Sequence, residues 1–479
     1  MVQPVLDIHM DWRASSAPDF NYSDTGGDIT ADVTSATWTR GTNFDGSSDS
    51  PGTCVLVVKN ADQKYDPKNA GSSLYGYIKP GPRLHIRATY SGTTYGLFFG
   101  YLRRIIPQPL TRTAELHYED QLYALDRQEA NVALSATRSL ADFRGAILNG
   151  IGEASNRRDL ASGVEIDIPA TAANGVNALN RLADCNRASG SVHWCAATDG
   201  AGGAGNPPYV YRVRERVELM TGSPLATYNA SSTGVTLDGY DLTDEAVVNG
   251  QRVTASITGF PEEAEVLWTS PTVPLVIPAS TTTYLWADVG VAQSVTVAYA
   301  GTGTVTTGVT QYDTSAYISL AVGATAVTVT ELTVSGKRGV SANVSAWSED
   351  AASRAVTAYG PLDGSEISTS MLSGLSMAQG LADSIVYRYK TPRTRPNLTL
   401  VNTWPDQLSR DICDRVAATS TRLSLSAVPY LIRGVTTTVT DGLYWVTSYK
   451  LEEVPTGGNW VTIGGTADQG VGGSAILAF

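Results

Sequence analysis

Apolar and polar residues alternate along most of the chain, with the period expected of strands that bury one face. The clearest case is residues 83–90, where Leu, Ile, Ala and Tyr alternate with Arg and His; a Ser-Gly turn then leads into a second apolar run at 97–102. Residues 53–58 are almost continuously apolar and β-branched, as in a strand buried on both faces. Asn60 and Asp62 end that strand by turn chemistry. The N-terminal part therefore predicts a β-sheet.

Helical periodicity is confined to a few places. Ser139 is a capping residue ahead of apolar residues spaced by three and four, which predicts a helix from that point. Asn174 predicts the start of a second helix, and the longest helix is expected at 368–390. Its apolar stripe runs through Met371, Leu375, Ala378, Ala382, Ile385 and Tyr389. The pattern as a whole predicts a mainly β chain with a smaller α/β part at about 113–235.

Residues 253–336 form a separate compositional block without Lys, Arg or His. Val and Thr alternate with small residues there, which predicts an antiparallel β-sandwich inserted at 260–335. This insertion is either a spacer or a surface-binding module for a glycan or a neighbouring protein. Aromatic residues of the block could stack on sugar rings or fill the core of the sandwich. They are Trp268, Tyr284, Trp286, Tyr299, Tyr312 and Tyr317.

Length and charge narrow the class of protein. The 479 residues are enough for about three or four domains. A net charge of −12 argues against the chain as a whole being a binder of nucleic acid. The sequence has no apolar run of membrane length and no basic leader, so we expect assembly inside a cell without a secretion signal.

The candidate chemistry is sparse. The four cysteines are too few and too scattered for a disulfide framework, and a bond between Cys185 and Cys195 is left open. The four histidines are isolated, and no His or Cys pair has the spacing of a zinc site. We therefore expect no enzyme activity, no metal and no cofactor. Paired carboxylates for glycoside cleavage stay open, because 46 acidic residues allow many pairs in three dimensions.

A series of short motifs, in a fixed order, resembles siphophage minor tail proteins of the baseplate-hub type. The matching segments are 60–62, 80–87, 99–102, 247–253, 349–360, 395–400 and 414–416. Cys413 stands where the family usually has a glycine before its Asp-Arg-Val motif. Each motif alone is common, so the resemblance rests on their order along the chain. The resemblance does not cover the insertion or the C-terminal tail.

The resemblance implies a multidomain fold with two tail-tube-like β-barrels, an α/β domain and an inserted β-sandwich. The expected segments are a first hub barrel at 1–112 completed by about 236–259, an α/β domain at 113–235, the sandwich at 260–335, strands and a long amphipathic helix at 336–391, a second hub barrel at 392–465 and a Gly-rich tail at 466–479. We expect the tail to be poorly ordered unless a partner holds it.

The resemblance also implies a function and a set of partners. Hub proteins of this type are structural and form a homotrimer at the virion tail tip, where six barrels from three subunits match a six-fold tube. The implied partners are the distal tail protein, the tape-measure protein and tip or fibre proteins, with DNA passing only transiently through the lumen. Two alternatives stay open: a receptor- or glycan-binding adhesin, and a tail-associated hydrolase of cell-wall or capsule sugar.

Overall fold

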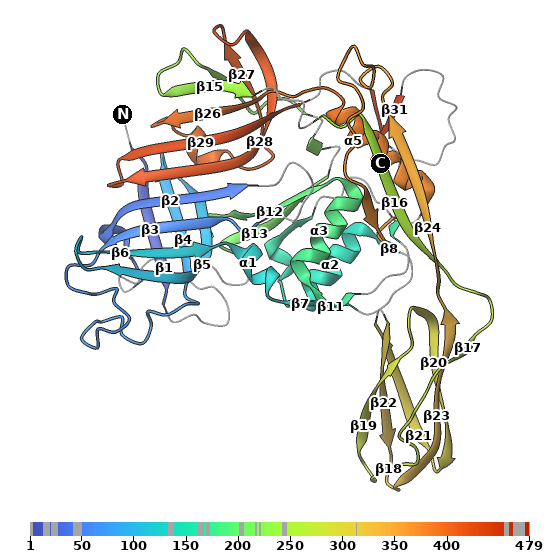
Figure 1. Ribbon diagram of the computed structural model, residues 1–479. Coiled ribbons are helices and arrows are strands. Elements are labelled where there is room, and N and C mark those ends of the chain that lie inside the picture. Colours follow the sequence, from blue (N-terminus) through green and yellow to red (C-terminus); the bar gives the residue numbers. More distant parts are fainter. Residues whose placement is uncertain are drawn as a thin grey trace.

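The chain is mainly β, with few helices among the residues that the structure describes (Figure 1). The computed structural model describes residues 3–12, 20, 27–41, 50–132, 138–160, 167–168, 173–200, 206–215, 218–219, 222–241, 247–312, 314–372, 374–454, 459–462 and 475–478. Among these residues, no helix is both long enough and apolar enough to cross a membrane.

The N-terminal strands form one half of a large sheet, which we call the first module. Its strands are β1 (Val5–Asp11), β2 (Val33–Gly41), β3 (Thr53–Lys59), β4 (Arg83–Tyr90), β5 (Thr93–Gln108) and β6 (Thr113–Glu119). They lie in the order β1-β4-β5-β6-β3-β2. The predicted alternation is confirmed in β4, where Leu84, Ile86 and Ala88 are fully buried. A short 3-10 helix, Thr30–Asp32, precedes β2.

A second group of strands forms the other half of the sheet, which we call the second module. It comprises β14 (Ala226–Asn229), β15 (Val235–Asp241), β26 (Arg395–Val401), β27 (Arg415–Ser420), β28 (Leu425–Thr440) and β29 (Tyr444–Glu453), with the short helix α6 (Asp406–Ser409) between β26 and β27. The strands lie in the order β14-β27-β28-β29-β26-β15. Leu398, Ile432 and Tyr449 are fully buried in its core.

The two modules share one plan. If each module's strands are numbered along the chain, both are arranged 1-4-5-6-3-2 across the sheet. Corresponding neighbours pair in the same sense except at one edge, where β1 meets β4 antiparallel and β14 meets β27 parallel. The modules join where Ser35–Gly41 of β2 pairs antiparallel with Gly434–Thr440 of β28, a contact that we call the seam. The result is one 12-stranded sheet.

This topology corrects two expectations. The described strands of the two modules lie in one continuous sheet and not in two separate closed barrels. Residues 236–259 do not complete the first module: β15 pairs with β26 of the second module, and β16 (Gly250–Gly259) pairs with β24 (Val340–Glu349) and β25 (Ile367–Thr369). Such partners are distant in sequence, so local pattern gives no information about them.

The α/β part lies between the first module and the β16–β24 strands (Figure 1). Its helices are α1 (Gln121–Asp126), α2 (Leu140–Gly150) and α3 (Ala178–Ser189), and the 3-10 helix Ser155–Arg157 follows α2. Its strands are β7 (Glu129–Val132), β8 (Arg138–Ser139), β9 (Arg158–Leu160), β10 (Asp167–Ile168), β11 (Ala173–Asn177), β12 (Val192–Ala197) and β13 (Tyr209–Arg214). The ends of the predicted segment 113–235 belong elsewhere, because β6 and β14 pair within the modules.

The helix starts of this part test the capping predictions. Ser139 caps α2 as expected, its hydroxyl accepting from the backbone N–H of Asp142 at 3.1 Å. The second helix begins later than expected: Asn177, not Asn174, caps α3 by accepting from the N–H of Asn180. Cys185 and Cys195 are both buried free thiols.

The longest helix, α5 (Leu375–Tyr389), packs against β16 and β24. It is shorter than the predicted 368–390, because Ile367–Thr369 forms β25 instead. Ala378 and Ala382 of the predicted stripe are buried, but Leu375 is 52% exposed. Leu375 is the first residue of the helix, so it lies beyond the packed part of the stripe.

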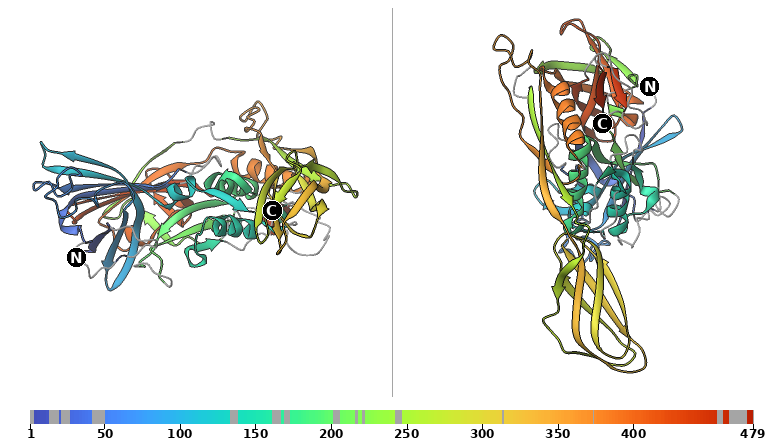
Figure 2. Two further views of the ribbon diagram at one scale, coloured as in Figure 1. Left: turned by 90° about the horizontal axis from the view of Figure 1, so that it is seen from below. Right: turned by 90° about the vertical axis from the view of Figure 1, so that its right-hand side faces the viewer.

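The insertion forms a β-sandwich that projects away from the rest of the chain (Figure 1 and the right-hand view of Figure 2). One sheet has β17 (Glu265–Thr269), β18 (Leu275–Ile277), β20 (Ala292–Thr302) and β23 (Val327–Arg338); the other has β19 (Thr282–Asp288), β21 (Val305–Gln311) and β22 (Ser315–Val322). Of the predicted tail 466–479, only β31 (Ala475–Ala478) is described, and it pairs in parallel with β30 (Asn459–Thr462).

Candidate interaction surfaces

The seam between the modules is held by packing as well as by backbone pairing. Trp38 on β2 and Trp445 on β29 meet edge to face with ring centroids 6.3 Å apart, and both side chains are buried. On the seam strands, the hydroxyls of Thr37 and Thr438 lie 3.1 Å apart. Aromatic contacts of this geometry add stability beyond the area that they bury. The seam is therefore a specific contact between two like modules.

The likeness of the modules extends to single residues. The two long strands β5 and β28 each contain a one-residue bulge, at Arg103 and at Arg433. Each bulged arginine pairs with a glutamate on the following strand: Arg103 Nε lies 3.0 Å from Glu119, and Arg433 Nε lies 3.5 Å from Glu452. The sequence did not reveal this repeat, because few residues that flank the two arginines are the same in the two strands. The only signal was an apolar-apolar-Arg triplet at 101–103 and again at 431–433.

At the seam, β2 of the first module pairs with β28 of the second. The strands that correspond to these two in the opposite modules, β15 and β5, have no such partner among the described residues. Among the described residues, β15 pairs only with β26, although it corresponds to β2. In the part of the chain that the structure describes, Arg104–Gln108 of β5 pairs only with β6, although it corresponds to the part of β28 that pairs with β2. Leu110, just beyond this edge, is 99% exposed. Unpaired edges of this kind are templates for another strand.

A second candidate surface is the outer face of the β21–β22–β19 sheet on the inserted sandwich. Ala287, Ala316, Ile318 and Leu320 point into the core and are buried, so the alternate positions point outward. Four of the six candidate aromatic residues gather on this outer face. They are Tyr284, Trp286, Tyr312 and Tyr317.

The four rings form a continuous strip. Tyr284 and Tyr317 are stacked, with centroids 5.4 Å apart and planes 5° apart. Trp286 lies 4.9 Å from Tyr317 and 5.5 Å from Tyr312. Tyr284 is 56% exposed and Trp286 is 55% exposed. These rings pack on one another and still leave much of their surface in water.

The other two candidate aromatic residues are not part of this strip. Trp268 on β17 and Tyr299 on β20 are partly buried and pack against the core of the sandwich. The Tyr299 hydroxyl accepts a hydrogen bond from the N–H of Val305 at 2.8 Å. Both residues therefore stabilise the sandwich from the opposite sheet.

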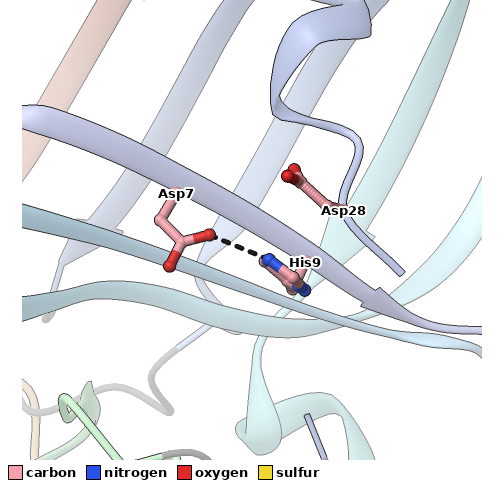
Figure 3. A group of neighbouring side chains, drawn as sticks. All are labelled: Asp7, His9 and Asp28. Carbon is pink, nitrogen blue, oxygen red and sulfur yellow. Dashed lines mark ion pairs between the residues drawn. The ribbon is translucent and has the colours of Figure 1, made fainter. Parts of the chain in front are cut away.

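Asp7, His9 and Asp28 form a possible metal-ligand cluster in the first module (Figure 3). Their ligand atoms lie within 4.8 Å of one another. However, Asp7 already pairs with His9 at 2.9 Å and with Arg87 at 2.6 Å. Burial raises the pKa of Asp7, but hydrogen bonds from His9 and Arg87 outweigh it and leave the pKa below its usual value. Because the Arg87 guanidinium supplies the positive charge, we interpret the cluster as an ion-pair network.

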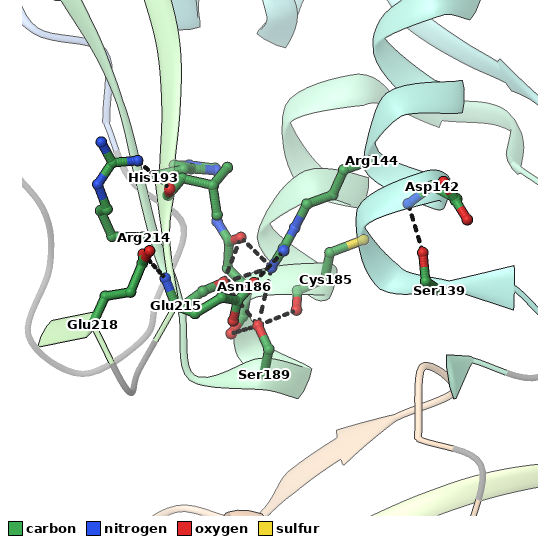
Figure 4. Close-up of polar contacts among 12 residues, drawn as sticks. Ser139, Asp142, Arg144, Cys185, Asn186, Ser189, His193, Arg214, Glu215 and Glu218 are labelled. Carbon is green, nitrogen blue, oxygen red and sulfur yellow. Dashed lines mark hydrogen bonds and ion pairs between the residues drawn. The ribbon is translucent and has the colours of Figure 1, made fainter. Parts of the chain in front are cut away.

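A buried polar network holds the α/β part together (Figure 4). Arg144 on α2 donates to Glu215 at 2.6 Å, and also to Asn186 and Ser189 on α3. His193 on β12 contacts Asn186 at 2.6 Å, and burial lowers the pKa of His193 to about 3. Arg144 is 1% exposed and His193 is 0% exposed. A network so far from water links α2, α3 and β12 and offers no surface to a substrate.

Comparison with known proteins returns structures but no sequence match. No protein-family model matches the chain, and no curated protein matches it. A tail protein from Neisseria meningitidis MC58 aligns at 9% identity over 94% of this chain and 97% of its own, with a TM-score of 0.47. The 43 kDa tail protein of prophage MuSo2 from Shewanella oneidensis aligns at 12% identity over 93% and 98%, with a TM-score of 0.48. The prophage tail protein gp18 from Listeria monocytogenes aligns at 9% identity over 92% and 94%, with a TM-score of 0.40.

Proposed function

We propose that the chain is a structural hub of a long, non-contractile phage tail, in which three copies close a ring at the distal end of the tail tube. One observation carries this proposal: the chain contains the same six-stranded plan twice, with one module-to-module seam made internally. Three such chains supply six similar modules, which is the number that a six-fold tube presents.

The unpaired edges give the ring a physical route to closure. If β15 of one copy pairs with Arg104–Gln108 of β5 on the next copy, the seam is repeated between protomers, because these strands correspond to β2 and β28. A contact between two different surfaces forms a closed ring when its rotation closes. In the ring, these two edges, which would otherwise invite aggregation, are covered.

The proposed partners follow from the sequence resemblance. In this proposal the ring connects the distal tail protein to tip or fibre proteins, holds the end of the tape-measure protein, and opens for DNA on host contact. A net charge of −12 is consistent with a conduit that does not grip phosphates. The role is structural and requires no catalytic group.

Mass photometry of the purified chain tests this proposal. We expect a species of three chains. Leu110→Glu places a charge just beyond the end of β5 and should shift the protein towards single chains. The matched control is Val356→Glu, since Val356 is 92% exposed but lies in the turns of residues 350–360, on neither β5 nor β15; it should leave the trimer intact. A single chain at every concentration, or equal association of the two variants, would contradict the proposal.

A further inference from the structure

We infer that the outer face of the β21–β22–β19 sheet binds an uncharged glycan, with sugar rings stacking on the four-ring strip of Tyr284, Trp286, Tyr312 and Tyr317. This inference concerns the inserted sandwich alone, and it does not depend on ring formation.

The first argument is the exposure of the rings. Tyr284 and Trp286 are more than half exposed, whereas the alternate positions of the same strand, from Thr283 to Ala287, are partly or fully buried. Single exposed apolar residues are ordinary, but a contiguous exposed aromatic patch marks a binding site. The strip crosses from β19 to β22, where Trp286 faces Tyr317 directly across the ladder. Its rings are therefore held by the sheet in a fixed arrangement before any ligand arrives.

The second argument is the chemistry around the strip. Tyr284 faces Ser319 across the β19–β22 ladder, and Tyr317 faces Thr310 across the β21–β22 ladder. Gly308 lies opposite Ser319, where an added Cβ would approach the serine hydroxyl oxygen to 2.6 Å. Short hydroxyl side chains and a glycine thus adjoin large rings. Sugar rings have one apolar C–H face and a rim of hydroxyls, so they match rings bordered by hydroxyl groups.

The third argument is charge. Residues 253–336 have no Lys, Arg or His, and Asp288 is exposed at the end of β19. Nucleic acids and polyanionic glycans need cations at their phosphates, carboxylates or sulfates, so this face disfavours them. A protein partner fits less well: protein interfaces are enriched in aromatic residues, but also in Arg and Met, and they are depleted in Ser, whereas this face combines its rings with hydroxyl side chains and no Arg. An uncharged glycan fits all three features of this face: its aromatic rings, its hydroxyl side chains and its lack of cations.

The position of the sandwich gives a ligand access to this face. The first and last strands of the sandwich, β17 and β23, connect it to β16 and β24 (Figure 1). The sandwich extends away from the body of the chain in Figure 1 and in the right-hand view of Figure 2. A long surface polysaccharide could therefore reach the strip without meeting the modules.

The test is a titration of the full-length chain with soluble β-1,4-linked glucose and N-acetylglucosamine oligomers, with heparin as a polyanionic comparison. Trp286 is the reporter, so binding of at least one neutral oligomer should change tryptophan fluorescence. Trp286→Ala and Tyr284→Ala should each weaken binding at least tenfold, as measured by calorimetry. Tyr75→Ala is the matched control, because Tyr75 is 53% exposed in the first module; it should leave the affinity unchanged.

Three results would overturn the inference. The first is no binding of either neutral oligomer at millimolar concentration. The second is unchanged affinity in both aromatic variants, which would place the glycan elsewhere. The third is a protein of the same tail whose binding is lost in those variants, which would make the face a protein-docking surface. Mass photometry of the same samples separates these results from a failure of the ring proposal, since the variants lie far from both strand edges.

Discussion

The two modules share a strand plan and a bulged Arg–Glu pair, yet they bury that pair very differently. The side chains of Arg433 and Glu452 in the second module are 2% and 1% exposed, whereas those of Arg103 and Glu119 in the first are 29% and 37% exposed. The difference comes from the element packed on each pair. Helix α5 places Arg388 against Glu452, and the Arg388 Nε–H donates to Glu452 Oε1 at 3.1 Å. On the first module, the ring of Tyr123 from α1 lies 3.8 Å from the Arg103 guanidinium.

This comparison shows that burial, and not the pair itself, decides what such a motif contributes. Burial alone would raise the pKa of Glu452, but the charges of Arg388 and Arg433 outweigh it and lower the pKa. Glu452 therefore stays ionised between two cations. The pair on the first module is partly solvated, and water screens most of its attraction. The same two residue types thus hold one module to its helix and contribute little to the other.

The largest expected effect is on the buried pair. Glu452→Ala leaves Arg388 and Arg433 without their shared carboxylate in a water-excluded position, so it should lower the free energy of unfolding by about 3–5 kcal/mol. Glu119→Ala, the matched change in the first module, should cost less than about 1 kcal/mol. Urea unfolding followed by tryptophan fluorescence measures both. An equal loss of unfolding free energy in the two variants would contradict the conclusion that burial makes the pair of the second module the stronger one.

A smaller effect is expected from acid, and it should fall on one module only. Burial lowers the pKa of His85 to about 3, although its Nε2–H donates to the Thr198 carbonyl at 2.8 Å. The folded pKa lies below the unfolded value, so the unfolded chain takes up a proton first as the pH falls. The stability from neutral His85 is complete above about pH 6.5 and is lost progressively towards pH 3, by up to about 1.4 kcal/mol per pH unit.

Hydrogen exchange at two pH values, corrected for intrinsic rates, measures this effect. Protection of β4 should fall between about pH 7.5 and about pH 5, while β27 and β28 change less, because the second module has no histidine. His85→Gln keeps a hydrogen-bond donor but removes the titrating group, so it should reduce the acid sensitivity of β4. Equal loss of protection in both modules would contradict the assignment.

The sequence could predict those features of the fold that depend on residues close together in the chain. The alternation at 83–90 and the Ser139 cap were correct because each depends on neighbours within a few residues. The strand partners were not predictable: the seam joins Ser35 to Thr440, and no local signal specifies a contact between such distant residues. For the same reason β15 was assigned to the wrong module.

The candidate site was predictable in its residue types but not in its membership. Tyr284 and Trp286 stand two apart in an alternating strand, so the sequence could place them on one face of a sheet. It could not tell whether that face was the core or the surface. Trp268 and Tyr299 lie on strands of the opposite sheet, which the spacing of residues along the chain could not reveal.

The equivalence of the modules, and the ring that follows from it, is tested most directly by disulfide cross-linking across the unpaired edges. The edge variant combines Asp238→Cys on β15 with Gln108→Cys on β5. These positions correspond to Thr37 and Thr438, which face each other at the seam. Thr37→Cys with Thr438→Cys is the control and should bond within one chain, since these hydroxyls are 3.1 Å apart. We predict that oxidation of the edge variant gives covalent species of two and three chains and none larger. Single chains only, or a ladder extending beyond three chains, would contradict the account.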